Sequence, residues 1–199
     1  MADTLGIWME LYKLSLSRRK IEAQERAIVR ELFNDWSGPA RFGVRDTEAF
    51  VGEIIRGLEQ RISAVVLNPN VRSVLEGLRQ RGKQTAILTG SKRSFVEPVL
   101  AREGIDFLVD LLVCLDDVRQ HKPHPEAVFK ALDSMGIPKE QAVMVGDSIK
   151  DIEMGKSAGI ATVLYFPEKN RVFYDPVWLM SSHPDFTIHD FSDLDGLIE

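Results

Sequence analysis

The chain has 199 residues and a formal net charge of −5, from 30 acidic and 25 basic side chains. This balance gives no broad positive field for nucleic acid or an anionic membrane. No apolar run approaches the roughly 20 residues of a membrane-spanning helix, and the N-terminus lacks the order of a signal peptide. The single cysteine, Cys114, lies in the apolar run "DLLVCL", where we expect a buried, inert thiol. We therefore expect a soluble cytoplasmic protein without nucleic-acid or membrane partners.

The N-terminal third of the chain is patterned for helices alone. Apolar residues recur at the i, i+3, i+4 spacing of one helix face over 5–16, 28–36 and 50–62. The second segment stops at Ser37-Gly38-Pro39, and Asp46 or Thr47 is suited to cap the third. We find no strand pattern here and predict a small helical domain over 1–68.

From residue 69 onward the pattern changes to short apolar runs that alternate with helical segments. The runs are "QTAILTG", "DLLVCL", "AVMVGD", "ATVLYF" and "DFTI". Short, almost wholly apolar strands separated by helices are typical of a parallel sheet covered on both faces. The sequence predicts a doubly wound α/β domain over 69–199. In such a sheet, ligands bind at the carboxyl ends of the strands.

The first strand end that attracts attention is Thr89-Gly90-Ser91. A hydroxyl at the strand tip, a glycine that allows close approach and the amides that start the next helix suit a phosphate group. An equally good interpretation is that Ser91 only caps that helix. This tripeptide alone does not separate the two.

The second strand end is "VMVGDSIKDIEMGKSAG". Asp147 follows the strand, and Asp151 lies one helical turn later on the same face. Two neighbouring carboxylates repel each other unless a cation or a shared proton holds them, and oxygen ligands suit Mg²⁺. Alternatively, Asp147 is a helix cap and Asp151 a favourable first-turn charge. That alternative does not explain the surrounding glycines, so we favour a magnesium site.

The third stretch is "HKPHPEAVFKAL", in which Lys122 stands just before a helix. A lysine held between prolines can present its ammonium group to a phosphoryl group or a carboxylate. A single loop lysine is usually only solvated, so this signal is weak alone. We expect His121 and His124 to be cap and loop residues, because no third His or Cys stands at metal-ligand spacing.

Taken in order, these stretches resemble the haloacid dehalogenase-like superfamily, in particular its phosphoglycolate-phosphatase-like hydrolases. "ILTGS" is similar to the second motif of that family, Lys122 in "KPHPE" to the third, and "VGDSIKDIEMGKSAG" to the fourth. The resemblance covers nearly the whole chain. It implies a Rossmann-like core with the helical N-terminal region as an inserted cap domain.

The resemblance also implies a mechanism, in which a phosphoryl group passes to an aspartate and is then hydrolysed with the help of Mg²⁺. By this analogy Thr89 and the backbone of Gly90 and Ser91 hold the phosphoryl oxygens. Lys122 offsets negative charge on the nucleophile and the phosphate. Asp147 binds Mg²⁺, and Asp151 supports it.

The first motif of the family, an apolar strand that runs into Asp-x-Asp-Gly-Thr, has no match here. The opening "MADTLGIW" resembles the residues that follow that motif, and Asp3 has no strand before it to make it a replacement nucleophile. In the family this strand lies between those ending at Thr89 and Asp147. We therefore expect this chain to lack hydrolytic activity. We also expect one of two structural consequences: either the core has a slot and the chain is poorly stable, or the two flanking strands close up.

The leading hypothesis is a Mg²⁺-dependent phosphatase of a small phosphorylated metabolite, seen without its first motif. The alternatives are a non-catalytic relative that binds a ligand or a partner protein, and a sugar phosphomutase. A dehalogenase is disfavoured because Asp147 and Asp151 keep the magnesium pattern. Arg41 or Arg45 can contact a substrate anion or remain solvated, and 167–184 can form a short helix on the core or an association surface.

Overall fold

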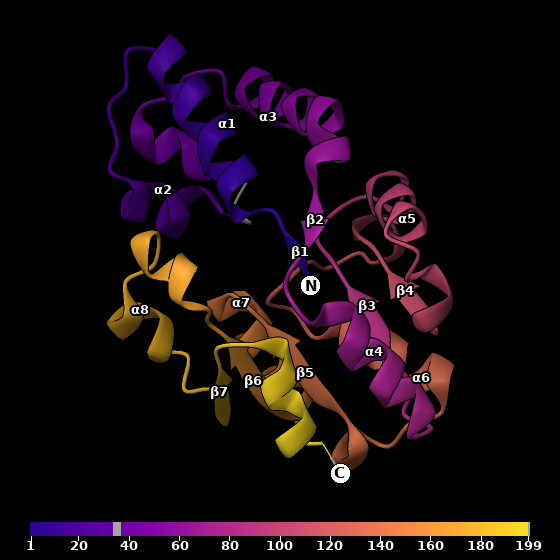
Figure 1. Cartoon of the computed structure of the whole chain (residues 1–199). Helices are drawn as coiled ribbons and strands as arrows, with labels where there is room; N and C mark the ends of the chain where they lie inside the picture. The colour runs from indigo at the N-terminus through magenta and orange to yellow at the C-terminus, as the bar shows by residue number, and fades with distance from the viewer. Residues whose placement is uncertain (34–36, 199) are drawn as a thin grey trace.

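The computed structural model describes residues 1–33 and 37–198 and confirms the predicted α/β fold (Figure 1). Its N-terminal region contains three helices, α1 (Leu5–Arg18), α2 (Glu25–Leu32) and α3 (Thr47–Arg61). The second helix ends at Leu32, because the backbone turns extended at Phe33, whereas the sequence predicts helix beyond that point. Trp36, which the pattern assigned to this helix, lies outside the described residues. Within the described residues, no helix is long and apolar enough to cross a membrane.

A short ribbon connects these helices to the rest of the molecule, in a region where the sequence predicts no strand. β1 (Ala2–Asp3) and β2 (Val66–Leu67) pair in antiparallel fashion. Lys169, from much later in the chain, donates hydrogen bonds to Asp3 (2.5 Å) and to Asn68 (2.8 Å), one on each side of the ribbon. The prediction was wrong here because strands of two residues are too short to leave a period-two pattern.

The remainder alternates helices and strands in the predicted order. The elements are α4 (Val71–Gln80), β3 (Ala86–Leu88), α5 (Arg93–Arg102), β4 (Leu111–Val113), α6 (Glu126–Met135), β5 (Val143–Gly146), α7 (Ile149–Ala158), β6 (Ala161–Tyr165), α8 (Pro176–Met180) and β7 (Phe186–Ile188). Each of the five predicted apolar runs contains one strand.

These five strands do not join into one sheet. β3 pairs in parallel with β4, and β5, β6 and β7 form a separate parallel sheet in that order. Within the described residues β3 and β5 are not paired, and both border one cavity of about 1290 Å³. Of the two expected arrangements, the structure has the open slot, and the flanking strands have not closed up.

Side chains of the strands alternate between two apolar layers. Ile87 and Val145 pack into the cluster that contains α4. Leu88 and Met144 pack into the cluster formed by α6 and α7. This alternation follows from the period of two along a strand, and it means that helices cover both faces of the sheets.

The segment after β6 contributes to a third apolar cluster. It forms a short 3₁₀ helix, η6 (Glu168–Val172), and then α8. Tyr174 and Leu179 are buried in a cluster that also contains the apolar faces of α1, α2 and α3 and Ile152 of α7. The structure thus shows the first of the two alternatives: this segment forms a short helix that packs against the core and beneath the N-terminal helices.

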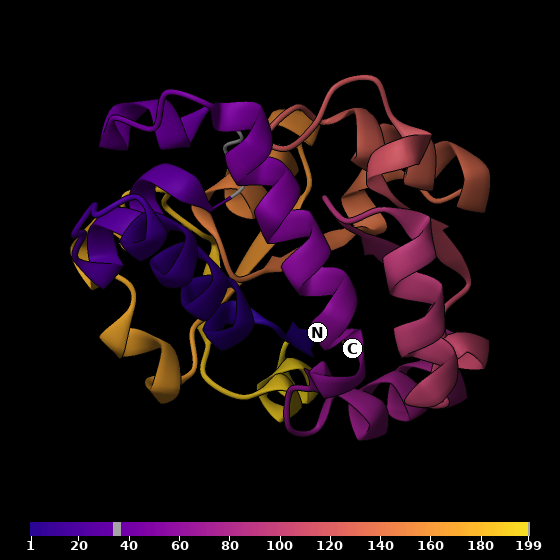
Figure 2. The same ribbon diagram turned by 90° about the horizontal axis from the view of Figure 1, so that it is seen from above.

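The packing of α1 against α3, visible from above in Figure 2, includes a half-buried ion pair. Arg19 donates two hydrogen bonds to Glu53, at 3.0 and 2.9 Å, and Ser15 donates a third at 2.6 Å. The Arg19 hydrogen bond is the largest cause that lowers the pKa of Glu53, to about 2 from an ordinary 4.5. A depressed carboxyl pKa stabilises the fold above the ordinary pKa, and this contribution is lost as the pH falls through the folded-state value.

We therefore expect Glu53→Gln to lower the free energy of unfolding at pH 7 by roughly 2 kcal/mol. The difference in the free energy of unfolding between wild type and Glu53→Gln should become smaller as the pH is lowered from about 4.5 toward about 2. Urea unfolding at a series of pH values measures both effects. Glu59→Gln, at an exposed position of the same helix, is the control and should change little. A difference in unfolding free energy that did not change with pH would contradict the role given to the ionised Glu53 carboxylate.

Candidate active site

The three predicted stretches meet at the carboxyl ends of β3 and β5 through the side chain of Lys122. Its Nζ donates to the carbonyl of Leu88, the last residue of β3, at 2.8 Å. The same Nζ donates to Asp151 Oδ1, on α7, at 2.7 Å. Residues from three separate segments are therefore joined at the carboxyl ends of β3 and β5. The lysine is held here by two acceptors and is only slightly exposed, rather than solvated in a loop.

The start of α7 fixes the position of Asp151. Ser148, not Asp147, is the N-cap, and its backbone and hydroxyl donate to Asp151 Oδ2 at 3.2 and 2.7 Å. The cap interpretation of Asp147 is thus wrong. Asp151 itself is buried, with both carboxylate oxygens engaged. Ser148 is a residue that the sequence analysis missed, although Ser-x-x-Asp is a recognisable capping pattern.

Gly146 explains how Asp151 comes so close to the end of β5. A Cβ atom at this position would lie 2.2 Å from Asp151 Cβ and 2.5 Å from its Cγ. No side chain fits there without displacing the carboxylate. Gly155 has a similar role further along the helix, where an added Cβ would lie 2.7 Å from Thr162 Cγ2 on β6. The glycines allow α7 to pack directly on its sheet.

The two carboxylates differ in their tendency to ionise. Asp147 is an exposed residue that lines the cavity, and desolvation by the surrounding protein, followed by the charge of Asp151, raises its pKa. Burial also disfavours a charge on Asp151, but Lys122 and the hydrogen bonds from Ser148 outweigh it and lower the pKa of Asp151. Asp151 is therefore a fixed charge compensated by Lys122. The positive charge that acts most strongly on Asp147 is the N-terminal ammonium group of Met1, and it does not outweigh desolvation and the charge of Asp151, so a bound cation would stabilise ionised Asp147.

These two aspartates supply an oxygen-only donor set. Within the described residues, no cluster of three or more His, Cys, Asp or Glu side chains is arranged around a common point. A pair of carboxylates with room for water fits Mg²⁺, which usually retains several waters and binds through one or two protein carboxylates. His124 is not part of this set, because its Nδ1 accepts the amide of Glu126 at 3.2 Å, as expected of a loop residue.

The tripeptide after β3 forms a compact turn. Thr89 donates its amide to Val113 of β4 at 2.9 Å, and its hydroxyl accepts the amide of Ser91 at 3.1 Å. Ser91 is not the helix cap, because α5 begins after Lys92. The cap interpretation of Ser91 is thus wrong. The Thr89 hydroxyl keeps its own proton, which is available to an anion.

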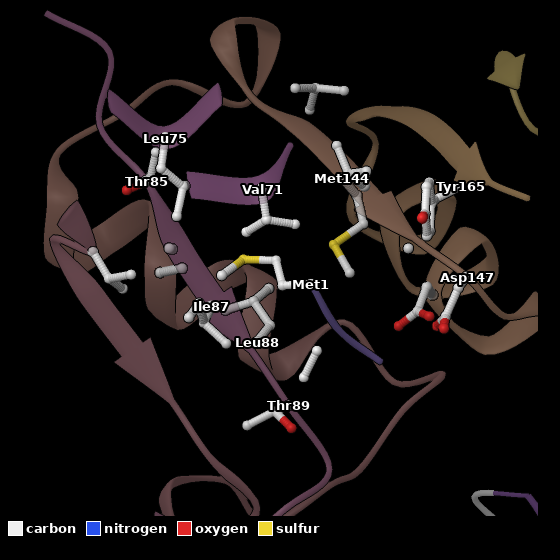
Figure 3. A pocket seen from close by; sticks show the side chains of 18 of the residues that line it. Met1, Val71, Leu75, Thr85, Ile87, Leu88, Thr89, Met144, Asp147 and Tyr165 are labelled. Carbon is white, nitrogen blue, oxygen red and sulfur yellow. The ribbon is translucent and has the colours of Figure 1, made fainter. Parts of the chain in front are cut away.

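All six predicted site residues, Thr89, Gly90, Ser91, Lys122, Asp147 and Asp151, line the cavity between β3 and β5. Figure 3 shows Thr89 and Asp147 at the rim and the Met1 side chain pointing into the cavity between Val71, Ile87 and Met144. The cavity is therefore apolar between the strands and polar at both of their ends, with Lys83, Gln84 and Glu140 among the lining residues at the amino ends.

Other candidates lie away from this rim. Asp3 forms an ion pair with Lys169 at 2.5 Å, within the ribbon. Arg41 forms an ion pair with Glu31 at 3.1 Å, and Arg45 is exposed. Neither arginine lines the cavity. A further neighbour of the carboxylates is Tyr174, whose pKa is raised well above its ordinary value by burial and by the charges of Asp147 and Asp151.

Comparisons with known proteins agree on one family. The sequence profile described as haloacid dehalogenase-like hydrolase matches residues 1–165. Pyrophosphatase PpaX of Halalkalibacterium halodurans is 35% identical over 119 residues, which cover 58% of this chain and 55% of that protein. Pyrophosphatase PpaX of Bacillus cereus is 36% identical over 125 residues, 62% of this chain and 56% of the relative. The chain thus spans about half the length of the curated relatives it matches.

Solved structures show the same fold at lower identity. A protein described as a predicted phosphoglycolate phosphatase, from Haemophilus somnus, aligns with a TM-score of 0.82 and 22% identity, over 100% of this chain and 93% of that one. CbbY from Rhodobacter sphaeroides, solved in complex with phosphate, aligns with a TM-score of 0.75 and 18% identity, over 98% and 91%.

Proposed function

Because the chain belongs to the haloacid dehalogenase-like hydrolases, we propose that it carries the phosphate and metal site of a Mg²⁺-dependent phosphatase for small phosphorylated metabolites. The helices α1–α3 are its cap domain. The relatives named pyrophosphatase and phosphoglycolate phosphatase indicate the substrate class, a compact and strongly anionic phosphate compound.

The observation that carries this proposal is the position of Lys122. Its ammonium group joins the end of β3 to Asp151, so the phosphate-type turn at Thr89 and the carboxylates face the same cavity rim. These two hydrogen bonds use two of the three N–H donors of the ammonium group. A cationic group between a hydroxyl turn and a carboxylate pair suits an anion that is bound together with a divalent cation.

The residues have distinct roles in this proposal. Thr89 donates its hydroxyl proton to a phosphoryl oxygen, and the backbone of Gly90 and Ser91 completes the turn around it. Lys122 places positive charge beside the phosphate, and Asp147 is the direct metal ligand. Asp151 holds Lys122 in place and adds negative charge toward the metal. Mg²⁺, when bound, supplies charge that offsets the phosphoryl oxygens.

The described residues do not supply a nucleophile at this site. Among the described residues, no aspartate lies on a strand between β3 and β5, and Asp3 forms an ion pair with Lys169. Positioning and charge alone do not replace the covalent step on which the family mechanism depends. We therefore expect this chain to bind Mg²⁺ and phosphate without turning over a substrate.

Calorimetric titration of the full chain with Mg²⁺, and then with inorganic phosphate, tests the site. Release of phosphate from pyrophosphate and from phosphoglycolate tests turnover. We expect saturable binding in the first experiment and no release above a protein-free control in the second. Turnover at an ordinary enzymatic rate, about 10 per second, would refute the proposal that the chain lacks a nucleophile. Absence of both binding signals would refute the proposed Mg²⁺ and phosphate site.

Asp147→Asn is expected to weaken Mg²⁺ binding at least roughly tenfold, because loss of even an indirect metal partner costs that much. Removal of a desolvated charge should leave the melting temperature equal to or above that of wild type. Calorimetry and thermal unfolding measure the two effects. Asp133→Asn, at an exposed position on α6, is the matched control. Unchanged Mg²⁺ affinity in Asp147→Asn would remove Asp147 from the metal site.

A further inference from the structure

Tyr174 is a buried tyrosine whose hydroxyl group has no hydrogen-bond partner among the described residues. It belongs to the segment between β6 and β7, which Figure 1 shows beneath the N-terminal helices, and it is only 4% exposed. Every fully buried side-chain nitrogen and oxygen in the described part of the chain has a partner. The hydroxyl of Tyr174, which has none, therefore keeps contact with solvent. The ring is enclosed, while its polar end faces an open space.

The packing of Phe166 places Tyr174 at the carboxyl ends of β5 and β6. In the parallel register, Gly146 at the end of β5 is level with Leu164, which lies two residues before Phe166. Asp147 directly follows Gly146, so it is close to the level of Phe166 along the strands. The ring of Tyr174 packs edge-on against the ring of Phe166, with 6.3 Å between the centroids. Tyr174 therefore lies beside the strand end that Asp147 follows.

The first turn of α7 belongs to the same apolar cluster as Tyr174. Ile152 is buried in this cluster, and Ile149 packs against it. The two isoleucines stand on either side of Asp151 in the helix, and Asp147 precedes them in the loop. Burial, and then the charges of Asp147 and Asp151, raise the pKa of the tyrosine hydroxyl well above its ordinary value. The hydroxyl thus stays protonated and can donate a hydrogen bond to a neighbouring carboxylate.

Asp147 is the carboxylate that remains available to this donor. Both oxygens of Asp151 are engaged, Oδ1 by Lys122 and Oδ2 by Ser148. Among the described residues, no other side chain donates a hydrogen bond to Asp147. Tyr174 does not reach Asp147 directly. A hydroxyl and a carboxylate at such a separation are commonly joined by one ordered water, which is enthalpically nearly as good as a direct hydrogen bond.

We propose that Tyr174 is a positioning residue of the magnesium site, whose hydroxyl donates a hydrogen bond through one water molecule to the carboxylate of Asp147. The bridge fixes the direction of this carboxylate before a cation binds. Indirect partners of this kind typically contribute ten- to hundredfold to metal affinity. The inference rests on the proposed function, because it takes Asp147 as the direct ligand of Mg²⁺. It gives a task to the segment 167–184 beyond apolar packing.

Tyr174→Phe removes the hydroxyl and keeps the ring. In the full chain, we expect this change to weaken Mg²⁺ binding about tenfold in a calorimetric titration. Addition of Mg²⁺ should produce a tyrosine difference spectrum in the near ultraviolet with wild type, and this signal should be absent from Tyr174→Phe. The melting temperature in EDTA should stay within about 2 °C of wild type, because the hydroxyl has no partner in the protein to lose.

Tyr12→Phe is the matched control. Tyr12 lies in the same apolar cluster, but its hydroxyl donates to the carbonyl of Leu32 at 3.1 Å. This variant should have a lower melting temperature and an unchanged Mg²⁺ affinity and difference spectrum.

Three results would overturn the inference. Equal Mg²⁺ affinity in wild type and Tyr174→Phe would do so and would leave the proposed function intact. Weaker binding by Tyr174→Phe with the difference spectrum retained would show a structural role only. Wild-type protein that bound no Mg²⁺ would refute the proposed function, and this inference with it.

Discussion

Gly146→Ala should destabilise the protein and displace Asp151 from its place in the site. The added Cβ would lie 2.2 Å from Asp151 Cβ and 2.7 Å from its Oδ2. The first of these atoms belongs to the start of the side chain and cannot rotate away, so the beginning of α7 must move. Overpacking costs about 1–3 kcal/mol, and a contact this short with an atom that cannot rotate away places this variant at the upper end. We expect an equal loss in the free energy of unfolding, measured with urea, together with loss of Mg²⁺ binding.

Gly77→Ala is the matched control for this experiment. Gly77 lies in α4, and an added Cβ meets nothing within 4 Å. Alanine is favoured over glycine in a helix by roughly 0.5–1 kcal/mol, so this variant should be equal to or more stable than wild type. If Gly146→Ala behaved like Gly77→Ala, Asp151 would not occupy the position described.

Lys122→Met is expected to have the second large effect. It removes the cation that compensates Asp151, a buried carboxylate, and it leaves the carbonyl of Leu88 without its partner. Loss of one member of a buried ion pair costs about 3–5 kcal/mol, of which a partly exposed pair should show the lower end. Urea unfolding measures the loss, and titration with inorganic phosphate should show no binding.

A double variant separates the charge of Lys122 from its packing. Lys122→Met combined with Asp151→Asn leaves no uncompensated carboxylate, and it should recover a large fraction of the stability lost in Lys122→Met. Phosphate binding should remain absent, because the cation is still missing. A double variant that is less stable than the sum of the two single changes would contradict the ion-pair account.

The local features of this chain were predictable because they depend on neighbours in the sequence. The helices that end at Gly82, Gly136 and Gly159 do so with these residues in the left-handed region, at φ of 69°, 65° and 74°, where glycine carries no steric penalty. The five apolar runs became strands because continuous apolar stretches bounded by turns suit a sheet buried on both faces. The capping box of Ser148 and Asp151 also depends on residues only three apart, so the sequence contained enough information to predict it.

Other features were decided by the tertiary structure alone. Period-two patterns identify a strand but not its partner, so the sequence could not show that β3 and β5 remain apart, nor that Ala2–Asp3 pairs with Val66–Leu67. The path of 167–184 beneath α1–α3 depends on which apolar faces meet. Lys122 and Leu88 are 34 residues apart in the sequence, and their hydrogen bond forms because the fold brings the loop that contains Lys122 to the end of β3. The residue types at the rim are thus a property of the sequence, while their meeting at one open cavity is a property of the packing.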